Sequence, residues 1–451
     1  MFSTTIAALA TPPGTGGLAV IRISGPKAED ILRALFVPAN KSKAFAPRYF
    51  MYGHLVFEGR ALDECMAVLM PAPNSYTRED VAEIQVHGGE TVVDSVLKAV
   101  FALGAVPAQP GEFTRRAFEN GRIDLSQAEA VMQLISASGK LARDAALRQL
   151  EGGALRFVRD AQGELIRLIS GVTAAIDYPE EISQEEAVGE IAPDLLSLAA
   201  SLLSACDERS AQILEEGLNV VICGKPNAGK SSLLNALLME EKAIVTDIPG
   251  TTRDLVSGSV QIDGVKVHLQ DTAGIRDSND TVERIGVERA KKAIKSADLR
   301  LMVLDADRKP DQEDEDILNL ISGMDNLYLF NKSDLLTPRH EDYFEAYDLP
   351  KEQTLRLSAL TGEGLELLKK RIREFAGQPG QTALTSLRHM SLARSAAEAL
   401  IRAANAMQQD LPLDLGAVDL NEALAALGEI TGENFSERLL DEVFSTFCVG
   451  K

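Results

Sequence analysis

The first 120 residues alternate short apolar runs with longer amphipathic stretches. Apolar runs over residues 18–23 and 81–86 each end in a turn that contains glycine, which is typical of β-strands. Residues 90–103 instead repeat their apolar positions with the period of a helix. This pattern predicts a mixed α/β domain over residues 1–120.

The spacing of apolar residues changes after residue 124, where it becomes helical. A first stripe on one helix face consists of Leu125, Ala128, Met132 and Ile135. A second stripe consists of Leu392, Ala396, Leu400, Ala403 and Met407. Because both segments are rich in alanine and acidic residues, we predict one helical domain in two parts, residues 121–217 and 379–451. Separate helical domains are the alternative.

The intervening residues 218–378 return to an α/β pattern, which predicts a domain inserted into the helical one. The whole chain has 451 residues, enough for about three domains. It contains no 18-residue apolar run, and its N-terminus lacks the layout of a signal peptide. The four cysteines are scattered, which indicates neither a disulfide framework nor a zinc site. We therefore expect a cytoplasmic protein that does not enter a membrane.

The net charge of −21 restricts the ways in which this chain could bind nucleic acid. The two predicted helical segments together carry 13 basic and 27 acidic side chains. A broad basic face for RNA is therefore unexpected. If the protein acts on RNA, a local patch or a partner protein must supply most of the phosphate contacts.

Residues Gly224–Ser232 match the pattern G-x-x-x-x-G-K-[ST]. The match lies between a predicted strand, residues 220–223, and a predicted helix, residues 233–238. Such a loop directs main-chain N–H groups and a helix N-terminus at an anion. Lys230 would reach the β- and γ-phosphates of a nucleotide, and the Ser231 hydroxyl would bind Mg²⁺. A glycine turn in an unrelated α/β unit is the alternative.

Further motifs follow in the order that a GTPase needs. Residues 271–274 read Asp-Thr-Ala-Gly after an apolar run, and residues 331–334 read Asn-Lys-Ser-Asp after another. A carboxylate at Asp334 would accept the two N–H donors of guanine and reject adenine. Residues 358–360 would close over the base, and the polar loop 246–254 could wrap the nucleotide and its metal. This set predicts a Ras-like P-loop GTPase domain.

The predicted GTP-binding residues come from all of these motifs. They are Asn227, Ala228, Gly229, Lys230, Ser231, Ser232, Thr246, Asp247, Ile248, Pro249, Gly250, Thr251, Thr252, Asp271, Thr272, Ala273, Gly274, Asn331, Lys332, Asp334, Ser358, Ala359 and Leu360. Ser231 and Thr252 are the predicted Mg²⁺ ligands, and we expect the site to bind GTP and GDP.

With these residues assigned, the chain resembles the MnmE (TrmE) family of tRNA-modification GTPases from end to end. The segments that carry the resemblance are 10–14, 21–25, 110–113, 124–129, 250–254, 282–286 and the final Phe-Cys-Val-Gly-Lys, residues 447–451. The resemblance implies an N-terminal domain that dimerises and binds 5-formyl-tetrahydrofolate or a related one-carbon folate. It also implies a heterotetramer with an FAD-dependent MnmG-type protein. Together the two proteins would add an aminomethyl or carboxymethylaminomethyl group to C5 of the wobble uridine, position 34, of certain tRNAs.

The same resemblance implies that Arg22, Glu79, Arg122 and Lys451 contact the folate. Arg122 stands where members of the family often have lysine, so its donor geometry differs. From the residues alone, Arg22 could be an edge residue of a strand in an ion pair, and Glu79 could belong to a helix or turn around residues 76–80. Cys448, which we place in a C-terminal helix, is expected to be a small buried apolar residue.

Hydrolysis needs a group that orients the attacking water. Ras-like proteins use a glutamine at the position where this chain has Ile275, which cannot bind water. The resemblance places the catalytic glutamate at Glu283; a surface position on a helix is the alternative.

The resemblance also implies that K⁺ replaces an arginine finger. Its predicted ligands are Asn227 and main-chain oxygens of the loop that holds Thr246, Ile248 and Thr251. Asn227 could instead only shape the turn.

Two other functions share part of this pattern. A ribosome-assembly GTPase would have the same nucleotide motifs, but it predicts a basic RNA-binding module at one end of the chain, which we do not find. A folate-binding module with a degenerate nucleotide site would lack the complete set of nucleotide motifs and would not turn over GTP.

Overall fold

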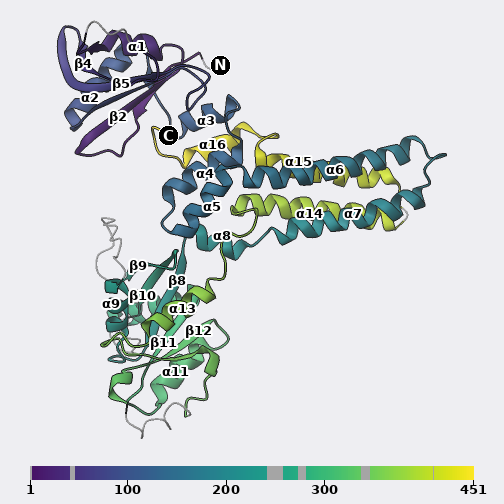
Figure 1. Cartoon of the computed structure of the whole chain (residues 1–451). Coiled ribbons are helices and arrows are strands. Elements are labelled where there is room, and N and C mark those ends of the chain that lie inside the picture. The colour runs from purple at the N-terminus through teal and green to yellow at the C-terminus, as the bar shows by residue number, and fades with distance from the viewer. Residues whose placement is uncertain (1–2, 41–45, 241–256, 273–280, 337–345, 410) are drawn as a thin grey trace. The chain divides into compact units, whose positions relative to one another are not determined.

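The computed structural model of the protein describes residues 3–40, 46–240, 257–272, 281–336, 346–409 and 411–451 (Figure 1). Side chains are described for these residues except 240, 257 and 281–287. Two compact units are formed, and each has its own core. The first unit comprises Met1–Met132, Gln149–Leu203 and Leu392–Lys451. The second unit comprises Gln133–Arg148 and Ser204–Ser391.

The first unit contains a seven-stranded sheet. Its strands are β1 (Ile6–Leu9), β2 (Gly16–Ser24), β3 (Phe36–Pro38), β4 (Met51–Phe57), β5 (Arg60–Met70), β6 (Val81–Gly88) and β7 (Val106–Pro107). They lie in the order β3-β4-β5-β6-β2-β1-β7. Neighbouring strands are antiparallel except β1 and β7, which are parallel.

Two helices pack against this sheet, α1 (Ala28–Leu35) and α2 (Glu90–Ala102). They bury Leu32 and Val96 in one core with Ile21 and Ile84 of the central strands. The alternating apolar positions of β2 and β6 therefore face these helices, as a half-buried strand requires. The predicted strands and helix of residues 1–120 are confirmed as β2, β6 and α2.

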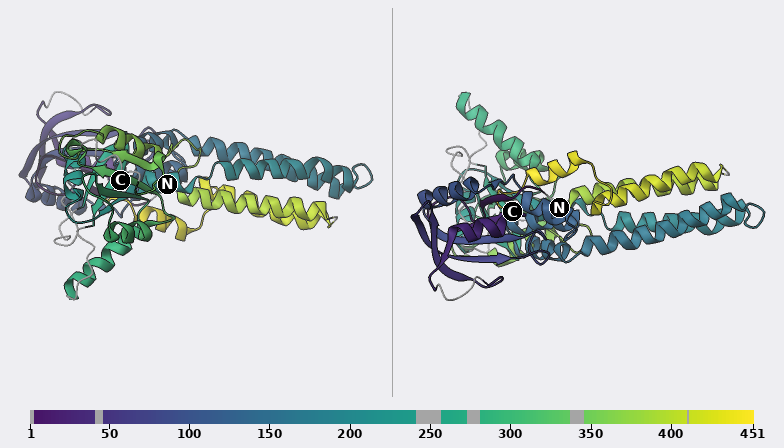
Figure 2. Two further views of the ribbon diagram at one scale, coloured as in Figure 1. Left: turned by 90° about the horizontal axis from the view of Figure 1, so that it is seen from below. Right: turned by 90° about the horizontal axis from the view of Figure 1, so that it is seen from above.

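Four long helices of the first unit lie side by side: α6 (Gly153–Asp177), α7 (Gln184–Ser204), α14 (Leu387–Gln408) and α15 (Leu413–Thr431). Figures 1 and 2 show them as one elongated bundle from several sides. In α14 the predicted stripe residues Ala396, Leu400, Ala403 and Met407 are buried. Small alanine side chains let the helices approach closely, which explains the alanine-rich composition.

Shorter helices complete the helical part: α3 (Glu112–Glu119), α4 (Leu125–Ser136), α5 (Lys140–Leu150), α8 (Glu208–Glu215) and α16 (Glu437–Ser445). The predicted helical stripe is confirmed, since Leu125, Ala128, Met132 and Ile135 all lie on α4. Leu125 and Ala128 are buried, but Ile135 is 46% exposed. Periodicity marks a face of a helix and does not say how far its neighbours cover that face.

The last residues of the chain pack against the first sheet. The Phe113 N–H donates a hydrogen bond to the Lys451 carbonyl at 3.2 Å. Gly450 has φ +93°, and a Cβ there would lie 2.3 Å from the Leu9 carbonyl oxygen. Only glycine allows the tail to run this close to β1. As a result, the Gly450 carbonyl accepts a hydrogen bond from Arg22 Nη1 at 3.2 Å.

The second unit contains a six-stranded sheet. Its strands are β8 (Leu218–Gly224), β9 (Ser257–Ile262), β10 (Val265–Asp271), β11 (Leu299–Asp305), β12 (Asn326–Asn331) and β13 (Thr354–Arg356). The order is β13-β12-β11-β8-β10-β9, and all neighbours are parallel except β9 with β10. The helices of this part are α9 (Lys230–Glu240), α10 (Thr281–Ser296), α11 (Gln312–Ile321) and α13 (Leu365–Phe375). The strands predicted before the nucleotide motifs are confirmed.

The division into three domains at residues 120, 217 and 378 stays a prediction. One stretch, Gln184–Glu215, is long and apolar enough to cross a membrane by length and composition, and 28% of its apolar window is buried. A single stretch of this kind is weak evidence, since core helices of water-soluble proteins pass the same test.

Candidate functional site

The predicted phosphate-binding loop connects β8 to α9. Lys230 is the first residue of α9, so the N-terminal N–H groups of this helix face the loop. Its ammonium group is buried and donates to the Lys225 carbonyl at 2.8 Å. Burial lowers the pKa of Lys230, while the charge of Asp271 opposes that shift. An anion in the loop would therefore gain a nearby, poorly solvated positive charge.

The loop meets the next motif through two side chains. Ser231 Oγ donates to Asp271 Oδ2 at 2.7 Å. Asp271 is 1% exposed, and within the described part of the chain its Oδ1 has no hydrogen-bond partner. A buried carboxylate oxygen that lacks a donor, next to a hydroxyl, suits a hard cation with oxygen ligands. The residues present thus fit Mg²⁺.

The motif at residues 331–334 contacts the phosphate-binding loop through the side-chain amide of Asn331. Asn331 Nδ2 donates to the Ala228 carbonyl at 2.9 Å, and Asn331 Oδ1 accepts from the Ala359 N–H at 2.9 Å. Asn331 is buried, so both halves of its amide must find partners. It thereby fixes the phosphate-binding loop and the loop after β13 with respect to each other.

The motif at residues 358–360 contacts the carboxylate of Asp334, which we predict to bind guanine. Ser358 Oγ donates to Asp334 Oδ1 at 2.5 Å, which leaves Oδ2 for a base. Lys332 Nζ lies 2.6 Å from Asp305 Oδ2 at the end of β11, so its stem is held along the same edge. Leu360 is 85% exposed.

All four motifs therefore meet at the carboxyl edge of the parallel strands. This is the edge where open α/β sheets bind ligands. Close packing at this edge depends on Gly229, which has φ +99°. A Cβ there would lie 2.0 Å from Asn331 Nδ2.

A second group of predicted residues gathers in the first unit. The Arg22 guanidinium lies 5.5 Å from the centre of the Tyr76 ring, and the Arg122 guanidinium lies 4.6 Å from it. Arg22 also forms an ion pair with Glu83 at 2.8 Å and contacts the Gly450 carbonyl. The structure thus brings Arg22, Arg122 and the C-terminal tail around one aromatic ring. Sequence reasoning missed Tyr76.

Glu79 lies beneath this group and is buried. Its carboxylate accepts from Ser24 Oγ at 2.8 Å and from Arg116 Nη1 at 3.1 Å. Ser24 Oγ also lies 2.7 Å from Thr77 Oγ1, so Glu79 holds the loop that carries the aromatic ring. These bonds leave the predicted contact of Glu79 with folate a prediction.

The expectation for Cys448 is wrong. It follows α16, which ends at Ser445, and its side chain is exposed. All four cysteines are free, in agreement with the absence of a predicted disulfide framework. Burial raises the pKa of the Cys65 and Cys223 thiols to about 12, so these two stay protonated at neutral pH.

Comparison with known families agrees with these motifs at both ends of the chain. A model of the MnmE helical domain matches residues 125–448, and a model described as GTP-binding protein TrmE N-terminus matches residues 5–122. The chain belongs to the MnmE family. It is 42% identical over 455 residues to the tRNA modification GTPase MnmE of Listeria innocua, covering 99% of both proteins.

Other relatives extend this comparison. The tRNA modification GTPase MnmE of Enterococcus faecalis is 42% identical over 461 residues, covering 99% of this chain and 98% of the relative. Among solved structures, Era of Aquifex aeolicus bound to GDP·AlF4− is 29% identical and covers 40% of this chain and 66% of that one, with a TM-score of 0.29. The family models and the two MnmE relatives confirm the resemblance to the MnmE family from end to end.

Several predicted residues of the MnmE-type site lie outside the described residues. They are Thr246, Asp247, Ile248, Pro249, Gly250, Thr251, Thr252, Ala273 and Gly274. Glu283 lies on α10, but its side chain is not among those described. Asn227 is described: it is exposed on the loop and has φ +64°. The roles of these residues stay predictions.

Sequence reasoning missed a second anchor of the phosphate-binding loop. Lys225 Nζ lies 2.7 Å from Asp311 Oδ2 and 2.7 Å from Asp314 Oδ2, and Asp314 is 1% exposed. Tyr347 OH donates to Asp314 Oδ2 at 3.0 Å. The bond from Lys225 lowers the pKa of the Asp311 carboxyl. Asp311 and Asp314 form a capping box that a sequence can reveal, whereas their contact with Lys225 needs the fold.

We predict that Gly229→Ala lowers the affinity for GDP at least about tenfold, or 1.4 kcal/mol. The added Cβ would meet Asn331 Nδ2 and displace the amide that joins the two loops. Binding of a fluorescent GDP analogue measures this. Gly323→Ala is the matched control, because Gly323 also has positive φ but no atom lies within 4 Å of its Cβ position. Equal loss in both variants would mean that backbone strain, and not the Asn331 contact, is responsible.

Proposed function

We propose that this chain hydrolyses GTP and uses the reaction in tRNA modification. The observation that carries the proposal is the hydrogen-bonded network in which Asn331 links Ala228 to Ala359, beside Ser231 and Asp271. Membership of the MnmE family, whose curated relatives are named tRNA modification GTPases, supports the second half of the proposal.

Each part of the network has a chemical task. Lys230 and the N-terminus of α9 bind the β- and γ-phosphates, and Asp334 accepts the N–H donors of guanine. Ser231 and Thr252 would hold Mg²⁺, and the Ser231 hydroxyl is hydrogen-bonded to Asp271. The metal would neutralise charge on the phosphate oxygens.

The attacking water requires a group other than residue 275, which is an isoleucine. We assign this task to Glu283 on α10, acting through a bridging water because it lies eight residues further along the chain. Its position on a helix that follows the Asp271 motif supports the assignment.

Potassium is proposed to supply the positive charge of the missing arginine finger. Its ligands would be the Asn227 side chain and main-chain oxygens around Thr246, Ile248 and Thr251. Asn227 supports the idea because it is exposed on the loop, three residues before Lys230. Amide and carbonyl oxygens suit a large monovalent cation.

The first unit is proposed to bind 5-formyl-tetrahydrofolate or a related one-carbon folate. Arg22 and Arg122 would contact its glutamate carboxylates or pterin ring, with Lys451 nearby, and Tyr76 offers a stacking surface. Glu79, on the loop that carries Tyr76, would also contact the folate. The same proposal includes a homodimer, an FAD-dependent MnmG-type partner and modification of C5 of uridine 34.

We predict that GTP turnover is at least about tenfold faster in KCl than in NaCl at equal ionic strength. This is a small share of the rate enhancement of about 10³–10⁵ that an arginine finger supplies. Phosphate release measures the rate. Asn227→Ala should remove the stimulation and keep most of the GDP affinity. Glu283→Ala should stop turnover in both salts. Equal rates in the two salts would contradict the role of K⁺.

We predict that Arg22→Ala abolishes binding of 5-formyl-tetrahydrofolate but leaves GDP affinity unchanged. The guanidinium lies in the first unit, whereas the nucleotide motifs lie in the second. Titration calorimetry of both ligands is the measurement. Arg33→Ala, on the surface of α1, is the control and should bind folate normally. Normal folate binding by Arg22→Ala would remove this residue from the site.

We predict that a strain without this protein accumulates tRNA lacking the aminomethyl-type group at C5 of uridine 34. Mass spectrometry of tRNA nucleosides measures the modification. Return of the gene should restore it, and return of the Glu283→Ala form should not, if hydrolysis is required. An unchanged nucleoside profile in the deletion strain would exclude the modification while leaving GTP hydrolysis untouched.

A further inference from the structure

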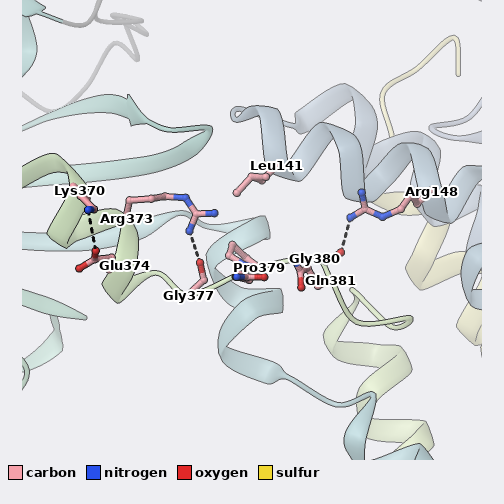
Figure 3. Close-up of a pocket in the computed structure, with 10 residues that line it drawn as sticks. Leu141, Arg148, Lys370, Arg373, Glu374, Gly377, Pro379, Gly380 and Gln381 are labelled. Atoms are coloured by element: carbon pink, nitrogen blue, oxygen red, sulfur yellow. Dashed lines mark hydrogen bonds and ion pairs between the residues drawn. The ribbon is translucent and has the colours of Figure 1, made fainter. Parts of the chain in front are cut away.

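A cavity of about 1030 Å³ lies in the second unit, away from the nucleotide motifs in sequence. Residues of α5, α13 and the connecting segment 377–381 line it (Figure 3). Three of the lining side chains are cationic, Arg148, Lys370 and Arg373, and one is anionic, Glu374. No step of GTP binding or hydrolysis described above uses these residues.

The two arginines approach the cavity from opposite ends. Figure 3 shows the guanidinium groups of Arg148 and Arg373 pointing toward one another above the connecting segment. Arg148 Nη2 donates to the Gly380 carbonyl at 2.5 Å, and Arg373 Nη1 donates to the Gly377 carbonyl. A guanidinium has five N–H donors, so one main-chain acceptor each leaves donors that can face a ligand. The main-chain bonds also hold both groups in place.

The charge around the cavity is positive in total. The one anionic side chain, Glu374, forms ion pairs with two cations: its carboxylate lies 4.0 Å from Lys370 Nζ and 3.3 Å from Arg371 Nη1. Lys370 is 71% exposed, so its ammonium group can reach a large ligand. The cluster gives the second unit a local positive patch, although the net charge of the chain is −21.

The lining favours one class of anion. Forked guanidinium groups bind phosphate in a bidentate way. No aromatic ring lines the cavity within the described residues, so nothing there would stack on a nucleotide base. We propose that this cavity binds phosphodiester groups of the tRNA backbone, an inference that rests on the proposed function in tRNA modification. It would give an acidic protein the local phosphate contact that its composition requires.

The test is the binding of a fluorescently labelled, unmodified tRNA transcript to the full chain, followed by anisotropy at several salt concentrations. The variant Arg148→Gln/Lys370→Gln/Arg373→Gln should bind tRNA at least about tenfold more weakly. The slope of log affinity against log salt concentration should become shallower by about one for each charge removed. Lys370→Glu alone should weaken binding in the same direction. Because no described hydrogen bond joins the Lys370 side chain to a main-chain atom, this single variant covers the case in which the triple variant does not fold.

The matched control is Lys291→Gln/Lys292→Gln/Lys295→Gln on α10. It removes the same number of charges from exposed positions of the same unit. The control should keep tRNA affinity and the salt dependence within about twofold, and every variant should keep GDP affinity. Equal losses in both triple variants would overturn the proposal, since total charge would then explain binding.

Other outcomes separate this site from the proposed function. Unchanged tRNA binding by both cavity variants would overturn the cavity as the site and leave a tRNA-modifying GTPase intact. A wild-type chain that hydrolyses GTP but binds no tRNA would overturn the cavity and also contradict direct tRNA contact by this protein. Competition by inorganic phosphate alone, without tRNA binding, would show a site for small anions and overturn the proposal.

Discussion

The amide of Asn331 is the interaction on which the nucleotide site depends. It donates to the phosphate-binding loop at Ala228 and accepts from the loop after β13 at Ala359. The amide is buried, and loss of either bond would leave a polar atom without a partner, at a cost of about 1–3 kcal/mol. This contact sets the distance between the phosphate end and the base end of the site. It also explains why residue 229 must lack a side chain.

A second constraint holds the same loop from its other side. Lys225 contributes its carbonyl to Lys230 and its ammonium group to Asp311 and Asp314. Breaking one partner of a buried pair is costly because the other charge stays behind. These contacts restrain the loop, so its main-chain N–H groups would need little rearrangement to meet phosphate. Preorganised donors of this kind are what phosphoryl transfer requires.

The first unit uses the end of the chain in a comparable way. Gly450 and Lys451 lie against β1 and α3, where the tail supplies a carbonyl to Arg22. Arg22 is held by Glu83 and by this carbonyl, so its guanidinium stays beside the Tyr76 ring together with Arg122. A ligand at this ring would contact residues from distant parts of the sequence, Arg22 and Arg122 among them. The family resemblance named both arginines, and the geometry adds the ring.

The sequence by itself determined the strands, most helix stripes and all four nucleotide motifs, because each depends on residues close together in the chain. Periodicity places β2, β6, β8 and α14, and the fixed spacing of a phosphate-binding loop places Lys230 and Ser231. Only the tertiary structure decided which distant side chains meet. Arg148 and Lys370 share a cavity, Lys225 contacts Asp314, and Ile135 stays exposed, because such contacts follow from the packing of whole elements and leave no local pattern to detect.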